Sequence, residues 1–111
     1  MNERRRYTRV QRLGRQDIAA LLLNGRKMRG RRVLVQVLPN TVGYARLGLT
    51  TSKRHVPLAV GRNRIKRLIR EWFRTGQEQL GAVDLLVRLM SPAAPLDVKH
   101  DLTALFPGCH S

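Results

Sequence analysis

The side chains in this sequence that are best suited to chemistry are cations, gathered between residues 62 and 74. Six of these thirteen residues are Arg or Lys, and Glu71 is the one acid among them. A helix face that meets only water usually mixes charge signs, because opposite charges three or four residues apart stabilise it. Guanidinium groups bind phosphates bidentately and stack on bases. We therefore predict polyanion binding here in preference to a solvated charged face.

No pattern typical of a catalytic or metal centre accompanies these cations. The seven acidic residues are scattered along the chain. His55, His100 and His110 lack the paired spacing of zinc ligands, and we interpret His100, Cys109 and His110 as surface or tail residues. Cys109 has no positioned base nearby that would make it a nucleophile, and there is no glycine-rich phosphate loop. The sequence thus predicts neither protein-based catalysis nor a metal site.

One amphipathic helix would hold the cations in place. Its apolar residues recur at the spacing of a single helical stripe, as expected of a helix that docks on a sheet. Asn63, Arg67, Arg70 and Arg74 point the opposite way, with Arg64 and Lys66 on the flanks. The stripe consists of Ile65, Leu68, Ile69, Trp72 and Phe73.

The rest of the chain is predicted to form an α+β domain around this helix. The β-helix-β step through residues 62–75 suggests a parallel pair in a mixed sheet, with helices on one face and the other face free. Gly25 and Gly76 are expected to end the first and second helices. We expect helices at 17–24, 62–75 and 97–106, strands at 33–38, 44–51 (its hairpin partner), about 58–60 and 84–90, and a basic connector at 26–32.

Bulk composition supports a single basic domain. The 111 residues carry 22 Lys and Arg against 7 Asp and Glu, a net charge of +15. Such a surplus is favourable beside a polyanion, and the dominance of Arg favours nucleic acid over an anionic membrane. A single cysteine fits a reducing cytoplasm, and no apolar run is long enough to span a bilayer. We predict one domain over 1–111, with 1–9 and 107–111 flexible.

Two motifs in series resemble the bacterial ribonuclease P protein subunit. They are RLGLTTSKR at residues 46–54 and, after a short loop, GRNRIKRLIRE at residues 61–71. The Arg-Asn-Arg run that opens the Ile-Lys-Arg helix is the signature of that family. The resemblance covers most of the chain, roughly residues 10–106.

The resemblance implies a fold and a division of labour. The fold would be a four-stranded mixed sheet with three helices in the order αβββαβα, with an unusual left-handed β-α-β crossover. The protein would assist a catalytic RNA, which carries the Mg²⁺ ions, in removing the 5′ leader of precursor tRNA. Its partners would be ribonuclease P RNA and precursor tRNA, with the protein monomeric in the ribonucleoprotein and no membrane involved.

The resemblance also implies two sets of site residues. The helix would face the RNA subunit through Arg62, Asn63, Arg64, Lys66, Arg67 and Arg70. A cleft between the first helix and the open sheet face would guide the leader along Arg12, Ile18, Leu22, Gln36, Ser52 and Lys53. The family commonly has aromatic residues at the positions of Ile18, Leu22 and Gln36, whereas this sequence has none there. We therefore expect leader binding to depend more on Arg12, Lys53 and nearby Arg residues.

Three alternatives remain open at this stage. The same charge and fold class would suit a ribosomal or translation-associated RNA-binding protein. A stand-alone nuclease would need the scattered carboxylates to converge, which the sequence does not predict. The second basic cluster, at 26–32, is as compatible with a flexible loop that makes no specific contact as with an RNA-contact loop.

Overall fold

Four strands form one mixed sheet in the computed structural model, which describes residues 12–109. The strands lie in the order β1-β2-β4-β3 across the sheet. β2 pairs antiparallel with both β1 and β4, whereas β3 runs parallel to β4. The predicted parallel pair on either side of the basic helix is therefore confirmed. The strands are β1 (Arg26–Arg29), β2 (Val33–Pro39), β3 (Arg46–Thr50) and β4 (Val83–Leu89).

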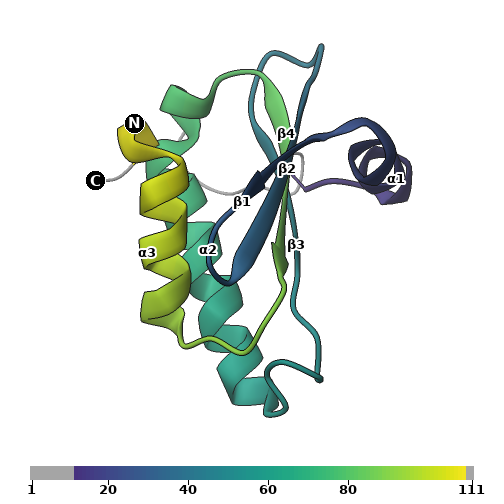
Figure 1. Ribbon diagram of the computed structural model, residues 1–111. Coiled ribbons are helices and arrows are strands. Elements are labelled where there is room, and N and C mark those ends of the chain that lie inside the picture. The colour runs from purple at the N-terminus through teal and green to yellow at the C-terminus, as the bar shows by residue number, and fades with distance from the viewer. Residues whose placement is uncertain (1–11, 110–111) are drawn as a thin grey trace.

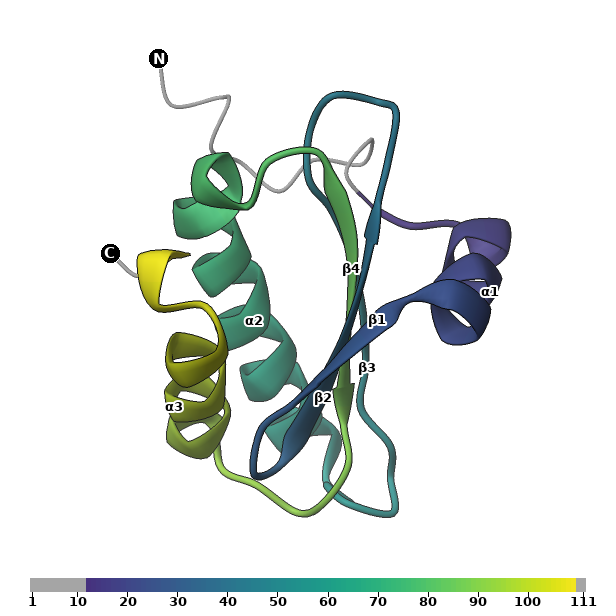
Figure 2. The same cartoon turned by 45° about the horizontal axis from the view of Figure 1, so that its top comes forward.

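Helices cover both faces of this sheet. The three helices are α1 (Arg15–Asn24), α2 (Ala59–Leu80) and α3 (Pro95–Leu105), and a short 3-10 helix, η3 (Pro107–Cys109), follows α3. α2 and α3 lie side by side on one face, and α1 lies on the opposite face (Figures 1 and 2). The expectation that one face would stay free of helices is thus wrong for the part of the sheet beneath α1.

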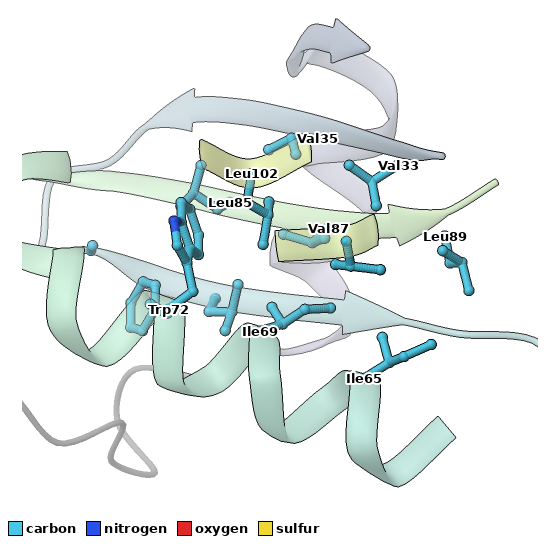
Figure 3. Packing of buried hydrophobic residues seen from close by; sticks show 13 residues of the cluster. Val33, Val35, Ile65, Ile69, Trp72, Leu85, Val87, Leu89 and Leu102 are labelled. Atoms are coloured by element: carbon cyan, nitrogen blue, oxygen red, sulfur yellow. The ribbon is translucent and has the colours of Figure 1, made fainter. Parts of the chain in front are cut away.

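Strand alternation divides the central strands between the two faces. Val33 and Val35 of β2, with Leu85 and Val87 of β4, point toward α2 and form the main core (Figure 3). Leu34, Gln36 and Leu86 alternate with them, so they point toward the α1 side. Both sets are buried, because each face is covered by at least one helix. Within the described residues, the main core lies between the sheet and the pair α2 and α3.

The basic helix is longer than predicted. α2 has 22 residues, and Gly76 is a buried residue inside it rather than its end. Gly76 lies eleven residues, about three turns, after Ile65, so it continues the apolar stripe. The actual stop is Gly81, whose φ of 76° lies in the region that favours glycine. The predicted strand at 58–60 is also wrong, because Ala59 and Val60 already form the first turn of α2.

Two further predictions about the strands are wrong. Residues 26–29, expected to be a connector, form the edge strand β1, which pairs with β2 from Arg26↔Val37 to Arg29↔Leu34. β2 and β3 are not hairpin partners, because β4 is inserted between them.

The structure matches the predicted fold class in its element order. Three helices and four strands follow one another as αβββαβα. The hand of the crossover through α2 stays a prediction. The segment 1–9, predicted to be flexible, lies outside the described residues, as do residues 110 and 111.

Candidate nucleic-acid interface

The outer face of α2 presents cations to solvent because the opposite face of the helix is fixed in the core. Ile65, Ile69, Trp72 and Phe73 are buried, with exposed fractions between 0% and 7%, and three of them are labelled in Figure 3. A helix anchored in this way cannot rotate, so the residues between the buried ones must face outward. The exposed set is Asn63, Arg64, Arg67 and Arg70, and Lys66 is half-buried on the flank.

Arg62 differs from the other predicted RNA-contact residues. Its Nη1 donates hydrogen bonds to the carbonyl oxygens of Val56 (2.9 Å) and Pro57 (2.8 Å). Its side chain is half-buried. Arg62 therefore holds the preceding loop against the first turn of α2, and it contributes less to the free cationic surface than its position in the motif suggests.

The loop held by Arg62 carries the predicted cleft residues Ser52 and Lys53. Both are exposed, as is Arg54. The carbonyl oxygen of Ser52 accepts the backbone N–H groups of His55 (3.2 Å) and Val56 (3.0 Å), which closes the loop into a turn. Lys53 and Arg54 thus sit in a turn fixed at both ends, next to the first turn of α2. The expected continuity between these cations and the α2 face agrees with this arrangement.

The one acid of the 62–74 segment is neutralised within the helix. Arg74 donates from Nε to a carboxylate oxygen of Glu71 at 3.0 Å, and from Nη2 to the same oxygen. This hydrogen bond lowers the pKa of Glu71 below its ordinary value and raises the pKa of Arg74. Because the carboxylate is occupied by Arg74, it does not offset the charges of Arg67 and Arg70.

Four other carboxylates act as structural acceptors away from this face. Asp17 accepts the N–H of Gly14 at 3.2 Å, and Asp97 accepts the N–H of Ala94 at 3.0 Å, each at a helix N-terminus. Asp84 and Asp101 are buried, with exposed fractions of 5% and 6%. These four acids thus serve the interior and the helix ends rather than the outer face of α2.

Asp84 belongs to a network that joins β3, β4 and α1. Arg46 donates to both oxygens of Asp84, from Nε and Nη2 at 2.8 Å each, and from Nη2 to Asp17 at 3.3 Å. The hydrogen bond to Asp84 raises the pKa of Arg46. This network fixes the start of α1 to the sheet.

The predicted leader-cleft residues on α1 have unequal exposure. Ile18 is half-buried, and its Cγ1 would lie 3.6 Å from a Cβ at Gly48. The bare backbone of Gly48 lets Leu13 and Ile18 approach the strand closely. Leu22 remains 47% exposed, and Arg12 is exposed where it bridges to β3 at Leu47. Leu22 and Arg12 are thus accessible to a ligand, whereas Ile18 is largely packed against the sheet.

Gln36 requires a correction. It lies between α1 and the sheet, as predicted, but it is 1% exposed and cannot contact a leader in this conformation. Its Nε2 donates to the carbonyl of Leu21 at 2.9 Å and approaches that of Leu22 at 3.5 Å. The Leu21 carbonyl also accepts the N–H of Gly25 at 2.8 Å, and both carbonyls belong to the last turn of α1. An aliphatic or aromatic residue could not make this bond, so Gln36 here holds the helix in place.

Sequence reasoning missed one further cation on the α1 side. Arg88 of β4 is half-buried, and its Nη1 donates to Oε1 of Gln36 at 3.3 Å. Strand alternation places Arg88 on the same face as Leu86, which a correct strand register would have revealed. Arg88 adds positive charge beneath α1, near the accessible residue Leu22.

Neither a metal-ligand cluster nor a membrane span is found in the described part of the chain. Over residues 12–109, no three His, Cys, Asp or Glu side chains converge as ligands of one ion. None of the helices there combines the length and apolar character needed to cross a bilayer. A metal site that includes His110, together with His100 or Cys109, is not tested, because His110 lies outside this range.

The fold and the surface together define a class: a small, strongly basic α+β domain with a cationic helix face suited to nucleic acid. Comparison with known families then places the chain. The family described as Ribonuclease P matches residues 7–106. The chain therefore belongs to the ribonuclease P family.

Individual relatives agree with this assignment. The "Ribonuclease P protein component" of Chromohalobacter salexigens is 49% identical over 61 residues, which cover 55% of this chain and 48% of the relative. The chain spans about half the length of the curated relatives it matches. Among solved structures, a mutant of Staphylococcus aureus RNase P protein with defective mRNA degradation activity is 26% identical with a TM-score of 0.78, covering 88% of this chain and 86% of that one. The RNase P protein of Thermotoga maritima, 24% identical with a TM-score of 0.71, covers 85% and 93% and supports the fold alone.

Proposed function

We propose that this protein is the RNA-binding component of a ribonuclease P ribonucleoprotein. In that assembly it assists a catalytic RNA in the endonucleolytic removal of the 5′ leader from precursor tRNA. The observation that carries the proposal is the outer face of α2, where Arg64, Arg67 and Arg70 are exposed and Glu71 is already occupied by Arg74. Membership of the ribonuclease P family supports the same assignment.

The protein would position RNA and leave the chemistry to the RNA subunit. The α2 face would neutralise backbone phosphates where RNA strands crowd together, which lowers the electrostatic cost of folding and docking. The catalytic Mg²⁺ ions would be held mainly by the RNA subunit. Four of the described carboxylates agree with this division, because Asp17, Asp84, Asp97 and Asp101 are committed to hydrogen bonds within the fold.

The leader would pass along the α1 side of the sheet. Arg12, Leu22, Ser52 and Lys53 are the predicted cleft residues that are exposed. Aromatic stacking contributes about 1–3 kcal/mol per base in proteins that bind single strands. Because Ile18, Leu22 and Gln36 are not aromatic, phosphate contacts by cations would supply most of the leader affinity.

The cellular setting follows from the same proposal. Ribonuclease P RNA and precursor tRNA would be the partners, with one copy of this protein acting in the cytoplasm without a membrane. A ribosomal or translation-associated RNA-binding role is the competing proposal, and it predicts no link to cleavage.

A reconstituted cleavage assay tests the proposal. Precursor tRNA would be incubated at low Mg²⁺ with a bacterial ribonuclease P RNA, with and without the full chain. We expect the protein to stimulate release of the 5′ leader, and the protein without the RNA to release none. Absence of stimulation would favour the ribosomal alternative, and cleavage by the protein alone would indicate a stand-alone nuclease.

A further inference from the structure

A groove runs between α2 and α3, on the side of the molecule opposite α1. Its open volume is about 450 Å³, within the range of small-ligand sites. Both views show the two helices lying side by side along this seam (Figures 1 and 2). None of the predicted leader-cleft residues lines it, so the groove is distinct from the α1 side of the sheet.

The lining of this groove combines an apolar wall with a cationic rim. Leu68 and Trp72 of α2 and Pro95 of α3 provide apolar surface. The cations are Arg64 and Arg67 from α2 and, facing them from α3, Lys99; all three are exposed. Proteins hold unpaired bases in positively charged grooves, where the bases stack on aromatic side chains or guanidinium planes.

The charge balance of the groove selects an anionic occupant. Glu71 is the one acid in the lining, and its carboxylate accepts hydrogen bonds from Arg74. Among residues 12–109, no acid forms an ion pair with Arg64, Arg67 or Lys99. Arg64 and Arg67 also belong to the α2 face, so one RNA segment could contact that face and enter the groove without a break.

We propose that the α2–α3 groove binds an unpaired nucleotide of the RNA that docks on α2. The base would lie against Leu68, Pro95 and the small part of Trp72 (7% exposed) that lines the groove, and the flanking phosphates would contact Lys99 and Arg67. This inference rests on the proposed function, because it extends the same RNA interface from α2 onto α3. It adds α3, which carries none of the predicted RNA-contact residues, to that interface.

The single tryptophan makes occupancy of the groove measurable. Trp72 is the only Trp in the chain, so fluorescence excited selectively at tryptophan reports on this one residue. We expect a short oligouridylate and a bacterial ribonuclease P RNA each to quench this fluorescence in a saturable manner. Quenching by polyglutamate at similar concentrations would overturn the proposal in favour of an acidic polypeptide as the occupant.

Adjacent positions on α3 supply a matched pair of variants. Thr103 lines the groove, whereas the exposed Ala104 lies on the other side of α3, beside Arg29 and Arg31. Thr103→Glu and Ala104→Glu add the same residue and charge to the same helix. We expect Thr103→Glu to weaken RNA binding on the order of tenfold more than Ala104→Glu, since it obstructs stacking and repels phosphate.

Lys99→Ala provides a second test that leaves the groove open. It should reduce the slope of log affinity against log salt by about one, as loss of one phosphate contact does. If Thr103→Glu and Lys99→Ala bind the RNA as tightly as Ala104→Glu does, the groove proposal fails. The proposed function still stands in that case if the wild-type protein stimulates cleavage. If the wild-type protein binds no ribonuclease P RNA, both fail. A change in sedimentation of the free protein in either groove variant would instead assign the groove to a second copy of the chain.

Discussion

At the scale of single residues, the buried Gln36 gives the first prediction on stability. Its amide links β2 to the last turn of α1 and to Arg88 of β4. Gln36→Leu would keep the volume but remove the bond to the Leu21 carbonyl, which still accepts the N–H of Gly25, and the bond to the guanidinium of Arg88. We expect a loss of about 1–3 kcal/mol in the free energy of unfolding, measured by urea denaturation.

The control for this prediction lies on α1 itself. Gln16 is exposed, so Gln16→Leu makes the same chemical change without removing a buried bond. We expect it to change stability by less than about 0.5 kcal/mol, as surface substitutions usually do. Faster amide hydrogen exchange confined to α1 in Gln36→Leu would locate the effect, and equal stability of the two variants would contradict the role given to Gln36.

Glu71 gives a second prediction, which is a gain in RNA affinity. Glu71→Gln should strengthen binding to ribonuclease P RNA severalfold, because Arg74 then becomes available to phosphate. Arg74 holds the pKa of Glu71 below its ordinary value, so the carboxylate stays ionised near neutrality. The ion pair is lost only as pH falls through that lowered pKa. At neutral pH the negative charge of Glu71 is therefore removed by mutation and not by titration.

Glu78→Gln is the matched comparison for Glu71. Both changes remove one negative charge from an exposed position of α2, about two turns apart. Filter-binding titrations at fixed salt would compare the two variants with the wild-type protein. Equal gains would mean that only net charge matters, which would argue against a local role for Arg74.

At the scale of elements, local pattern identified the units that bury a continuous apolar face. The stripe of α2 from Ile65 to Phe73 was predicted correctly, because its 3.6-residue period is set by the helix alone. The edge strand β1 was missed, because three of its four residues are charged and only Met28 packs against the core. Charged edge strands are common because they discourage pairing with other chains.

The partner of β3 could not be read from local sequence. The turn at 39–43 resembles a hairpin connection, yet β4 separates β2 from β3. This choice depends on contacts between residues nearly 40 positions apart, such as Arg46 with Asp84. The Leu85-Leu86-Val87 run was the available signal, since a strand buried on both faces is usually central.

The attachment of α3 to the sheet gives a prediction at this scale. Asp101 is buried and accepts the backbone N–H groups of Arg32 (2.6 Å) and Val33 (3.1 Å), at the start of β2. Asp101→Ala would leave two donors unsatisfied and should cost about 2–3 kcal/mol of unfolding free energy. Thermal and urea denaturation would measure this loss.

Asp97→Ala is the control, because it also removes a carboxylate from α3 but leaves the hydrogen bonds of Asp101 intact. Asp97 accepts the N–H of Ala94 at the exposed start of the same helix. Loss of this cap should cost about 0.5–1 kcal/mol, clearly less than Asp101→Ala. A reversed order of the two variants would show that the helix N-terminus, and not the buried bond, attaches α3.

At the scale of the whole molecule, charge is sorted by location. The described acids Asp84 and Asp101 are buried, and Asp17 and Asp97 sit at helix starts. Outward-facing cations therefore dominate the surface of α2 and the loop before it. The sequence predicted the surplus of +15, but only the fold shows that these four acids lie away from the outer face of α2, which leaves Glu71 and Glu78 as the acids of that helix. Which of the cations meet RNA is still a prediction.

The leader path tests this charge sorting across the molecule. Lys53 follows β3 at one edge of the sheet, and Lys27 lies on β1 at the other edge; both are exposed. Without aromatic residues at positions 18, 22 and 36, leader affinity should depend steeply on salt.

Lys53→Ala should reduce the salt slope by about 0.7, the value for one contact to single-stranded phosphate. The measurement is holoenzyme affinity for precursor tRNA as salt rises. Lys27→Ala is the comparison that localises the effect, because Lys27 pairs with Gln36 and so lies on the same face at the far edge of the sheet. Mature tRNA, which has no leader, should bind equally to the wild-type, Lys53→Ala and Lys27→Ala holoenzymes. A shallow slope in the wild-type protein, or a Lys53→Ala effect that persists with mature tRNA, would show that cations near Lys53 do not guide the leader.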